Sequence, residues 1–341
     1  MTAGSQPAQT RGEEAVDRRT FVIGTVASAA GAVAVPALAE DAYPNHAITI
    51  INPYPPGGAN ELVTRPLAAA LEPVLKQPVV METKAGASGQ VGAQYVASAK
   101  PDGYTLLTHN TSISGSAEVD KLFGRKPKFT NADFIPIARI VADPCLLLVN
   151  DQQPYKSLKE FVDDAKKRPN QIIFSSAGLY SAIHIPMALF AKAAGGLQLR
   201  HLPTNGGGPA LTALLGNNAQ VGVISVSGAL AQVKAGKLRP LASFGGKRSK
   251  ALPDVPTMKE LGYNIEYYLW VGILAPKGTP DDAVSVLRAG IKQVVHTDQF
   301  KATLANIGLE LDYLDGPDFA KFWAADAKRV VGAVDVIGRV Q

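Results

Sequence analysis

Short apolar runs alternate along this chain with longer segments in which apolar residues recur every three or four positions. The short runs are typical of buried β-strands, and the longer segments are typical of amphipathic helices. Regular alternation of the two predicts mostly parallel sheets covered by helices on both faces. The predicted strands cover 48–52, 78–82, 104–108, 135–141, 145–149, 171–175, 198–203, 220–224, 238–243, 270–275 and 309–313. The predicted helices cover 60–76, 88–99, 157–167, 181–194, 207–215, 227–234, 280–295 and 316–332.

The sequence gives a clear start signal for the predicted helix over 157–167, but it has two prolines inside the predicted helix over 60–76. Ser157 and Glu160 form a capping box at the start of the helix over 157–167. The helix over 60–76 contains Pro66 and Pro73, and each proline removes one backbone hydrogen bond. We therefore expect the helix over 60–76 to be kinked or to begin late.

The predicted strands fall into two groups, which indicates two α/β lobes. The chain crosses from the first lobe to the second near residue 144 and returns near residue 270. A hinge made of two chain crossings allows two lobes to close around a ligand. The predicted organisation is a discontinuous first lobe of residues 45–143 plus 271–341 and a second lobe of residues 144–270.

The first 39 residues have the pattern of an export signal. Arg18 and Arg19 precede an apolar run without charges that ends at Val35, and small residues follow up to Ala39. Paired arginines before such a run are typical of the twin-arginine route. We therefore expect cleavage after Ala39 and a periplasmic location. The alternative is an uncleaved membrane anchor.

Composition narrows the class of partner. The chain has 341 residues, 46% of them hydrophobic and 18% charged, with a formal net charge of +5. Its basic residues are scattered and are not interleaved with aromatic residues, which argues against a nucleic-acid partner. A mildly positive surface instead suits small anions. Cys145 is the only cysteine, so no internal disulfide can form.

The loop Pro53–Gly58 is the most informative segment for function. It joins a predicted strand to a predicted helix and carries Gly57 and Gly58 directly before that helix. Helix starts have unpaired N–H groups and partial positive charge, and glycines let a ligand approach the backbone closely. The loop therefore suits an anion that is held and not transformed. The alternative is an ordinary strand-to-helix turn.

Four further polar loops follow predicted strands, at 108–112, 175–181, 204–208 and 225–227. Ligands of open α/β sheets bind at the carboxyl ends of the strands. Hydroxyls and backbone amides in such loops can bind a carboxylate without a lysine. Each loop alone is also explained by simple helix capping. Five such loops in register with the strands favour a ligand cleft.

Searches for catalytic motifs find nothing. The sequence has no nucleophile elbow, no phosphate-binding loop motif and no dinucleotide fingerprint. Its five histidines have no metal-ligand spacing. We therefore predict no catalytic residue, no metal, no cofactor and no enzymatic activity. An exported enzyme is the alternative that the twin-arginine pattern favours slightly.

At this point the residues resemble a known family, the Bug-type solute receptors of tripartite tricarboxylate transporters. The resemblance covers nearly all of the chain after the export signal. It is carried by the segments Pro55–Gly58 with Arg65, Gln77–Val80, Gly86–Ala93, Pro101–Leu106, Leu252–Thr257, Glu260–Gly262 and Trp270–Pro280.

The resemblance implies a two-lobed type II periplasmic-binding-protein fold that holds a carboxylated small molecule between its lobes, often through ordered waters. It implies delivery of that ligand to membrane permease subunits, and we expect a monomer. A sensor that presents its closed form to a membrane regulator is the alternative. The ligand-binding residues that it implies are Tyr54, Gly58, Ser88, Thr108 and Asn110 in the first lobe and Ser176, Gly178, Ser181, Thr204 and Ser225 in the second.

The chain departs from the family pattern around the second-lobe loops. Tyr180 stands where the family has a second glycine, and we include it among the ligand-binding residues. Thr204-Asn205 replaces a common Tyr-Lys pair, and Gln220 and Ile224 replace frequent acidic residues. We therefore expect an altered far end of the pocket, where Tyr180 narrows the space or stacks on a ring of the ligand.

Overall fold

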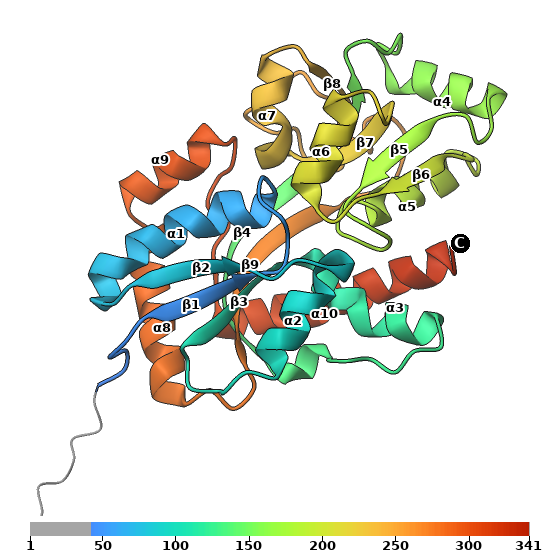
Figure 1. Ribbon diagram of the computed structural model, residues 1–341. Helices are drawn as coiled ribbons and strands as arrows, with labels where there is room; N and C mark the ends of the chain where they lie inside the picture. The colour runs from blue at the N-terminus through green and yellow to red at the C-terminus, as the bar shows by residue number, and fades with distance from the viewer. Residues whose placement is uncertain (1–41, 341) are drawn as a thin grey trace, which may run out of the picture. The chain divides into compact units, whose positions relative to one another are not determined.

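Two long antiparallel strands form the centre of the fold in the computed structural model, which describes residues 42–340 (Figure 1). The strand β4 (Phe134–Asn150) pairs with β9 (Tyr268–Pro276) as far as Pro144, and from Cys145 onward it pairs with β7 (Val221–Ser225) and β8 (Leu238–Ser243). The sequence predicted two strands here, at 135–141 and 145–149, and that separation is wrong. Asp143 and Pro144 do not break the strand, because a residue before proline prefers an extended backbone.

Most of the other strands are parallel, as predicted. The sheet order is β2-β1-β3-β9-β4-β7-β5-β6. In the first group of strands β1 lies parallel to β2 and β3, and in the second group β5 lies parallel to β6 and β7. The bounds of these strands are β1 (Ile48–Asn52), β2 (Val79–Thr83), β3 (Thr105–Asn110), β5 (Ile173–Ser176) and β6 (Arg200–Pro203).

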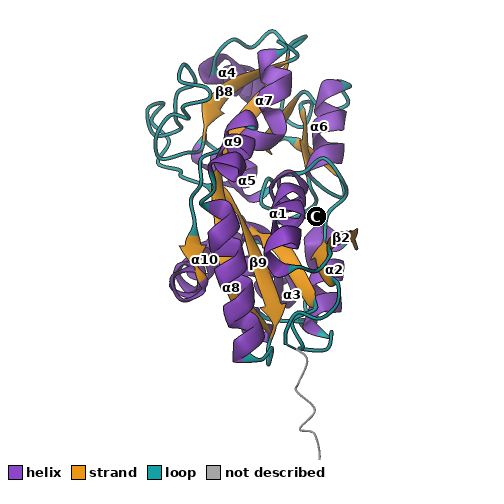
Figure 2. Ribbon diagram, turned by 90° about the vertical axis from the view of Figure 1, so that its left-hand side faces the viewer, coloured by secondary structure: helices purple, strands orange, loops and turns teal. Residues whose placement is uncertain are grey.

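Helices cover both groups of strands. Figure 2 shows α4, α6 and α7 around the upper group and α8 and α10 around the lower group. The first group has α1 (Ala59–Leu75), α2 (Gln90–Ala97), α3 (Ser116–Leu122), α8 (Asp281–Val295), α9 (Asp298–Asn306) and α10 (Gly316–Ile337). The second group has α4 (Leu158–Lys167), α5 (Ile185–Ala193), α6 (Gly207–Leu215) and α7 (Val226–Lys234). Short 3-10 helices are η1 (Ala87–Gly89), η2 (Thr111–Gly115) and η3 (Asn131–Asp133).

Several predicted boundaries need correction. The helix α1 begins at Ala59 in spite of its two prolines, so the late start is wrong; a buried face from Val63 to Leu75 holds it in place. The predicted strand at 309–313 is also wrong, since the strand that pairs with β4 in this region is β10 (Leu314–Asp315). The helices α3 and α9 were not predicted.

One correction matters for the site. The helix predicted over 181–194 begins only at Ile185, with Pro186 in its first turn. Proline is favoured at that position because it has no N–H to leave unpaired. Ser181 and the two residues after it therefore lie in the loop that precedes α5.

The C-terminal helix α10 packs against β4 and also against α5. The contact with α5 includes a hydrogen bond, in which the Lys192 ammonium group of α5 donates to the Val336 carbonyl oxygen of α10 over 2.8 Å. The described residues, 42–340, belong to one compact unit. The lobe boundaries given above stay a prediction, and the predicted export signal at 1–39 lies outside the described residues. None of the helices between residues 42 and 340 has the length and apolar character that crossing a membrane requires.

Candidate functional site

A cavity lies where the loops after β1, β5 and β7 meet. Its wall comes from the loop before α1, the loop before α5, and the first turns of α6 and α7. The volume open to the centres of water molecules is about 40 Å³. At about 10–15 Å³ for each water, this is room for roughly three waters. The residues that line it include Tyr54, Gly58, Asn60, Glu61, Asn110, Ser181, Ile183, Gly207, Ser225, Gly228 and Leu269.

Three helix N-termini converge on this cavity, those of α1, α6 and α7. Each has a partial positive charge in its first turn. Helix starts have N–H groups without a helical partner, but in α7 the Ser227 and Gly228 N–H groups are already bonded to Asp143 Oδ2 and Ser225 Oγ. Among the described residues that line the cavity, Glu61 is the only charged one. Its carboxylate accepts from the Gly57 N–H over 2.7 Å and is paired with Arg65. Burial acts to raise the pKa of Glu61, but the hydrogen bonds from Arg65 and Gly57 outweigh it and lower the pKa.

The loop before α5 offers the clearest free donors. Ser181 is 1% exposed, and its hydroxyl has no hydrogen-bond partner within residues 42–340. The backbone N–H groups of Ala182 and Ile183 also have no acceptor in the described part of the chain. A buried polar group without a partner is costly, so such groups mark places where a ligand or water belongs.

Tyr54 anchors the opposite wall. Its hydroxyl lies 2.6 Å from Ser112 Oγ in η2 and 3.1 Å from Oδ1 of Asn110, the last residue of β3. Burial raises the pKa of Tyr54, against the effect of its hydrogen bonds with Ser112 and Asn110, so the phenol stays neutral. The neighbouring His109 is also buried, and burial lowers its pKa to about 4. This wall is therefore polar and uncharged near neutral pH.

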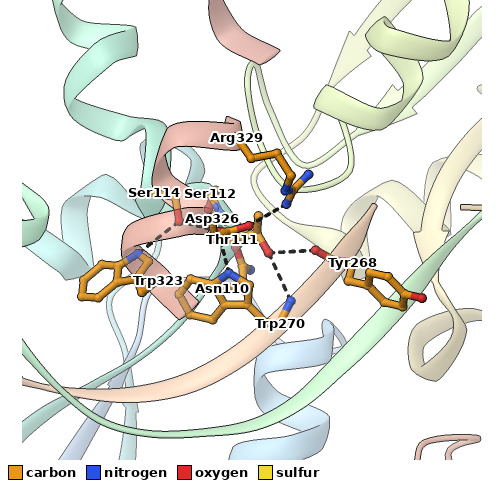
Figure 3. Close-up of polar contacts among 9 residues, drawn as sticks. All are labelled: Asn110, Thr111, Ser112, Ser114, Tyr268, Trp270, Trp323, Asp326 and Arg329. Atoms are coloured by element: carbon orange, nitrogen blue, oxygen red, sulfur yellow. Dashed lines mark hydrogen bonds and ion pairs between the residues drawn. The ribbon is translucent and has the colours of Figure 1, made fainter. Parts of the chain in front are cut away.

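A hydrogen-bonded network behind this wall holds η2 in place (Figure 3). The buried Asp326 of α10 accepts from Ser114 Oγ over 2.8 Å, from Trp270 Nε1 over 2.8 Å and from Arg329 over 2.6 Å. Thr111 Oγ1 accepts from the Trp270 N–H over 3.1 Å. The network ties η2 to β9 and α10, and it fixes the segment that supplies Asn110 and Ser112.

Glycines allow the loops of the two groups of strands to touch. A Cβ atom on Gly208 would collide with the Pro56 carbonyl oxygen, and one on Gly178 would collide with Ser88 Oγ. Gly178 has a φ of +101°, which also favours glycine. Ser88 Oγ donates over 3.3 Å to the Ala177 carbonyl oxygen across this contact. The two sides of the cavity are therefore in direct contact.

The structure brings five of the predicted ligand-binding residues to the cavity and leaves six behind it. Those that line it are Tyr54, Gly58, Asn110, Ser181 and Ser225. Thr108, Ser176 and Thr204 support the loops from behind through bonds to Thr64, His201 and the Ser176 carbonyl oxygen. Ser88 and Gly178 form the contact between the two sides.

Tyr180 points away from the cavity. Its hydroxyl donates to the Gly338 carbonyl oxygen over 2.7 Å and accepts from the Val340 N–H over 3.1 Å. Its ring lies edge-on to Phe123, with 6.0 Å between centroids. The described contacts of Tyr180 thus join the loop before α5 to the C-terminal segment. A role for Tyr180 in ligand binding stays a prediction.

Several residues of the site were not identified from the sequence. Asn60, Ile183 and Leu269 line the cavity, but nothing in their local pattern marks them. Gly207 also lines it and lies in the polar loop at 204–208, although it was not named singly. Asp143 could have been found, because a carboxylate in the middle of an apolar run is unusual. Within residues 42–340, no three His, Cys, Asp or Glu side chains are grouped so that they could hold a metal ion.

Asp143 is fully buried beside the first turn of α7. Its Oδ2 accepts from Ser227 Oγ over 2.5 Å and from the Ser227 N–H over 3.3 Å. Its Oδ1 has no partner among the described residues. Burial raises the pKa of Asp143 to about 7, and the hydrogen bonds from Ser227 oppose that shift.

This shift predicts how stability depends on pH. The pKa of Asp143 rises from 3.8 to about 7 on folding, so the native state binds the extra proton between these values. The free energy of unfolding should therefore fall as pH rises from about 4 to about 7, by up to about 4 kcal/mol from this group. Urea unfolding at pH 5, 6, 7 and 8 should show a steeper fall for the wild type than for Asp143→Asn. Parallel profiles would contradict the prediction.

Comparisons with known proteins agree with this geometry. The family model described as tripartite tricarboxylate transporter family receptor matches residues 63–338. The protein BugT of Bordetella pertussis is 32% identical over 324 residues, which cover 94% of this chain and 98% of BugT. BugD, whose structure is described as that of a periplasmic binding protein, superposes with a TM-score of 0.81 at 28% identity, over 87% of this chain and 99% of BugD.

Two solved structures of relatives contain ligands. Rpa4515 of R. palustris, solved with adipate, has a TM-score of 0.82 and 27% identity, over 87% of this chain and 98% of that one. MatC of Rhodopseudomonas palustris, solved with bound malate, has a TM-score of 0.79 and 26% identity, over 86% of this chain and all of that one (100%). These matches confirm the predicted type II periplasmic-binding-protein fold, and the chain belongs to the Bug-type receptors of the tripartite tricarboxylate transporter family.

Proposed function

We propose that this protein is a periplasmic receptor that binds a small organic acid between its two lobes and delivers it to membrane permease subunits. The unpartnered Ser181 hydroxyl, set among three helix N-termini, carries the proposal. Hydroxyl and N–H donors of this kind suit a carboxylate, and none of the described residues that line the cavity is a lysine or arginine that would pair with it. Relatives with bound adipate and malate support the ligand class.

The size of the cavity indicates how the ligand enters. A volume of about 40 Å³ suits a carboxylate group with a bridging water, but a whole dicarboxylate needs more room. The contact between Gly208 and Pro56 must therefore separate to admit the acid. Donors from both sides then favour the closed state, because the ligand contacts both lobes only when they approach. Export through the twin-arginine route, predicted from Arg18 and Arg19, would place the receptor in the periplasm.

A thermal-shift screen of residues 40–341 tests the proposal. The set should contain adipate, malate, tricarboxylates and aromatic acids, and the matched controls are the diamides of adipate and malate. A ligand at 100 times its Kd should stabilise the protein by about 2.7 kcal/mol. We expect at least one acid to raise the unfolding temperature and its amide to have no effect. If protein that has been unfolded and refolded to remove carried-over ligand responds to no acid, the proposal is wrong.

A further inference from the structure

Asp143 is connected to the cavity through two serine hydroxyls. Its Oδ2 lies 2.5 Å from Ser227 Oγ, and Ser227 Oγ lies 3.2 Å from the Oγ of Ser225, a residue that lines the cavity. Leu269 provides a second route, since it pairs with Asp143 across β4 and β9 and also lines the cavity. An anion in the cavity would therefore lie close to a buried carboxyl group.

The direction of the hydroxyl chain depends on the protonation of Asp143. When Asp143 is ionised, the Ser227 hydroxyl donates to its Oδ2. When Oδ2 carries a proton, it can donate to Ser227 Oγ, and the Ser227 hydroxyl is then free to donate to Ser225 Oγ. Ser225 can in turn direct its own hydroxyl into the cavity, where a carboxylate would accept it. Protonation of Asp143 thus removes a negative charge that repels the ligand. It also reverses the hydrogen bonds of Ser227 and Ser225, so that their hydroxyls donate in the direction of the cavity.

The groups around Asp143 do not neutralise it. Cys145 lies on the same strand, and its pKa is raised by burial first and by the charge of Asp143 second. Tyr267 lies just before β9, and burial raises its pKa as well. Arg329 of α10 acts on Cys145 and Tyr267, but its guanidinium group is paired with Asp326.

The remaining neighbours of Asp143 also leave its charge in place. The helix α7 has no charged residue before Lys234. Lys247 and Glu266 line the groove at the opposite face of β4 together with Pro144. On the cavity side, Glu61 stays ionised near neutral pH because its pKa is lowered. Of the two carboxyl groups, Asp143 and Glu61, Asp143 is therefore the one that can gain or lose a proton near neutral pH when a ligand binds.

We propose that Asp143 takes up a proton from solvent when an organic anion enters the cavity, so that this receptor binds carboxylates more tightly as the pH falls. The inference rests on the proposed function and adds proton linkage to it. A unit charge at about 10 Å, in a medium of effective dielectric constant about 20, raises the pKa of a carboxyl group by about one unit. For a group titrating near pH 7, this gives about fivefold tighter binding at pH 6 than at pH 8, with uptake of about half a proton at pH 7.5.

Isothermal titration of the mature chain with adipate, malate and any acid found in the screen tests this inference. Titrations at pH 7.5 in two buffers with different heats of ionisation count the protons taken up for each ligand bound. Carboxylic acids of this kind are themselves ionised from pH 6 to pH 8, so they add little to the count. Wild type and the exposed control Asp282→Asn should take up about half a proton and lose about fivefold in affinity between pH 6 and pH 8. In Asp143→Asn the proton uptake and the pH dependence should both disappear.

The outcomes separate the inference from the proposed function. Binding without proton uptake, or with the same pH dependence in Asp143→Asn, would overturn the inference and leave the receptor function standing. If no acid binds at any pH, the proposed function fails and the inference fails with it. If Asp143→Asn does not fold, infrared difference spectra of the wild type decide the matter. The band of a protonated carboxyl group should then gain intensity on ligand addition, and no gain would overturn the inference.

Discussion

Replacing Ser181 with leucine should weaken carboxylate binding by at least about 100-fold and leave the fold intact. The substitution removes a donor whose hydrogen bond to a charged group is worth about 1.5–3 kcal/mol. It also places a larger side chain in a cavity of about 40 Å³. Ser181 lies in the loop before α5 and not in a helix, so the leucine disturbs no helical hydrogen bond. Titration calorimetry with the acid identified by the screen measures the loss.

Two further variants separate the effect of losing the Ser181 hydroxyl from the effect of adding side-chain volume. Ser181→Ala removes the hydroxyl without adding volume and should weaken binding by about tenfold or more. Thr303→Val removes an exposed hydroxyl on α9 and should bind as the wild type does. Circular dichroism and the unfolding temperature of the ligand-free proteins check the fold. A leucine variant that is folded and binds with wild-type affinity would exclude Ser181 from the site.

Asp326→Ala should lower the free energy of unfolding by about 3–5 kcal/mol, the range for breaking a buried hydrogen-bonded charge network. The carboxylate accepts from Ser114, Trp270 and Arg329, and alanine would leave the first two as buried donors without an acceptor. Each unsatisfied donor costs about 1–3 kcal/mol. Urea unfolding at pH 7 gives the difference, provided that the slope with denaturant is unchanged.

Asp326→Asn is the control for this prediction. Asparagine keeps an oxygen that can accept from Ser114 and Trp270, and it loses mainly the pair with Arg329, whose side chain is 42% exposed. Pairs with such exposure contribute about 1 kcal/mol or less. The asparagine variant should therefore lose about 1 kcal/mol. Equal losses of unfolding free energy in the two variants would show that the bonds from Ser114 and Trp270 to Asp326 do not stabilise the fold.

The sequence by itself determined most of the helices and strands of this protein. The helix over 207–215 and the strand over 238–243 have the predicted bounds, because each has a regular apolar pattern between clear breaks. The loops after the strands at 48–52 and 220–224 were identified as binding segments, and they do meet at the cavity. Local patterns carry this information because propensity, capping and periodicity depend on residues near in sequence.

Where the prediction failed, a distant part of the chain decided the local structure. The extended backbone at Asp143 and Pro144 is fixed by pairing with Leu269 and Tyr268, more than a hundred residues later. The orientation of the Tyr180 hydroxyl is likewise set by the C-terminal segment, through bonds to Gly338 and Val340, while a role for Tyr180 in ligand binding stays a prediction. No window of neighbouring residues contains these partners.

Only the tertiary structure decided which polar groups remain free for a ligand. Ser176, Ser181 and Thr204 look alike in the sequence as serine and threonine residues in polar loops. Folding gives Ser176 a bond to His201 and gives Thr204 a bond to Ser176, while Ser181 has no partner among the described residues. It also buries Asp143 beside the cavity, where the loss of solvation raises its pKa to about 7. Hydrogen-bond satisfaction and desolvation depend on the whole packed environment of a group, and so composition and spacing cannot specify them.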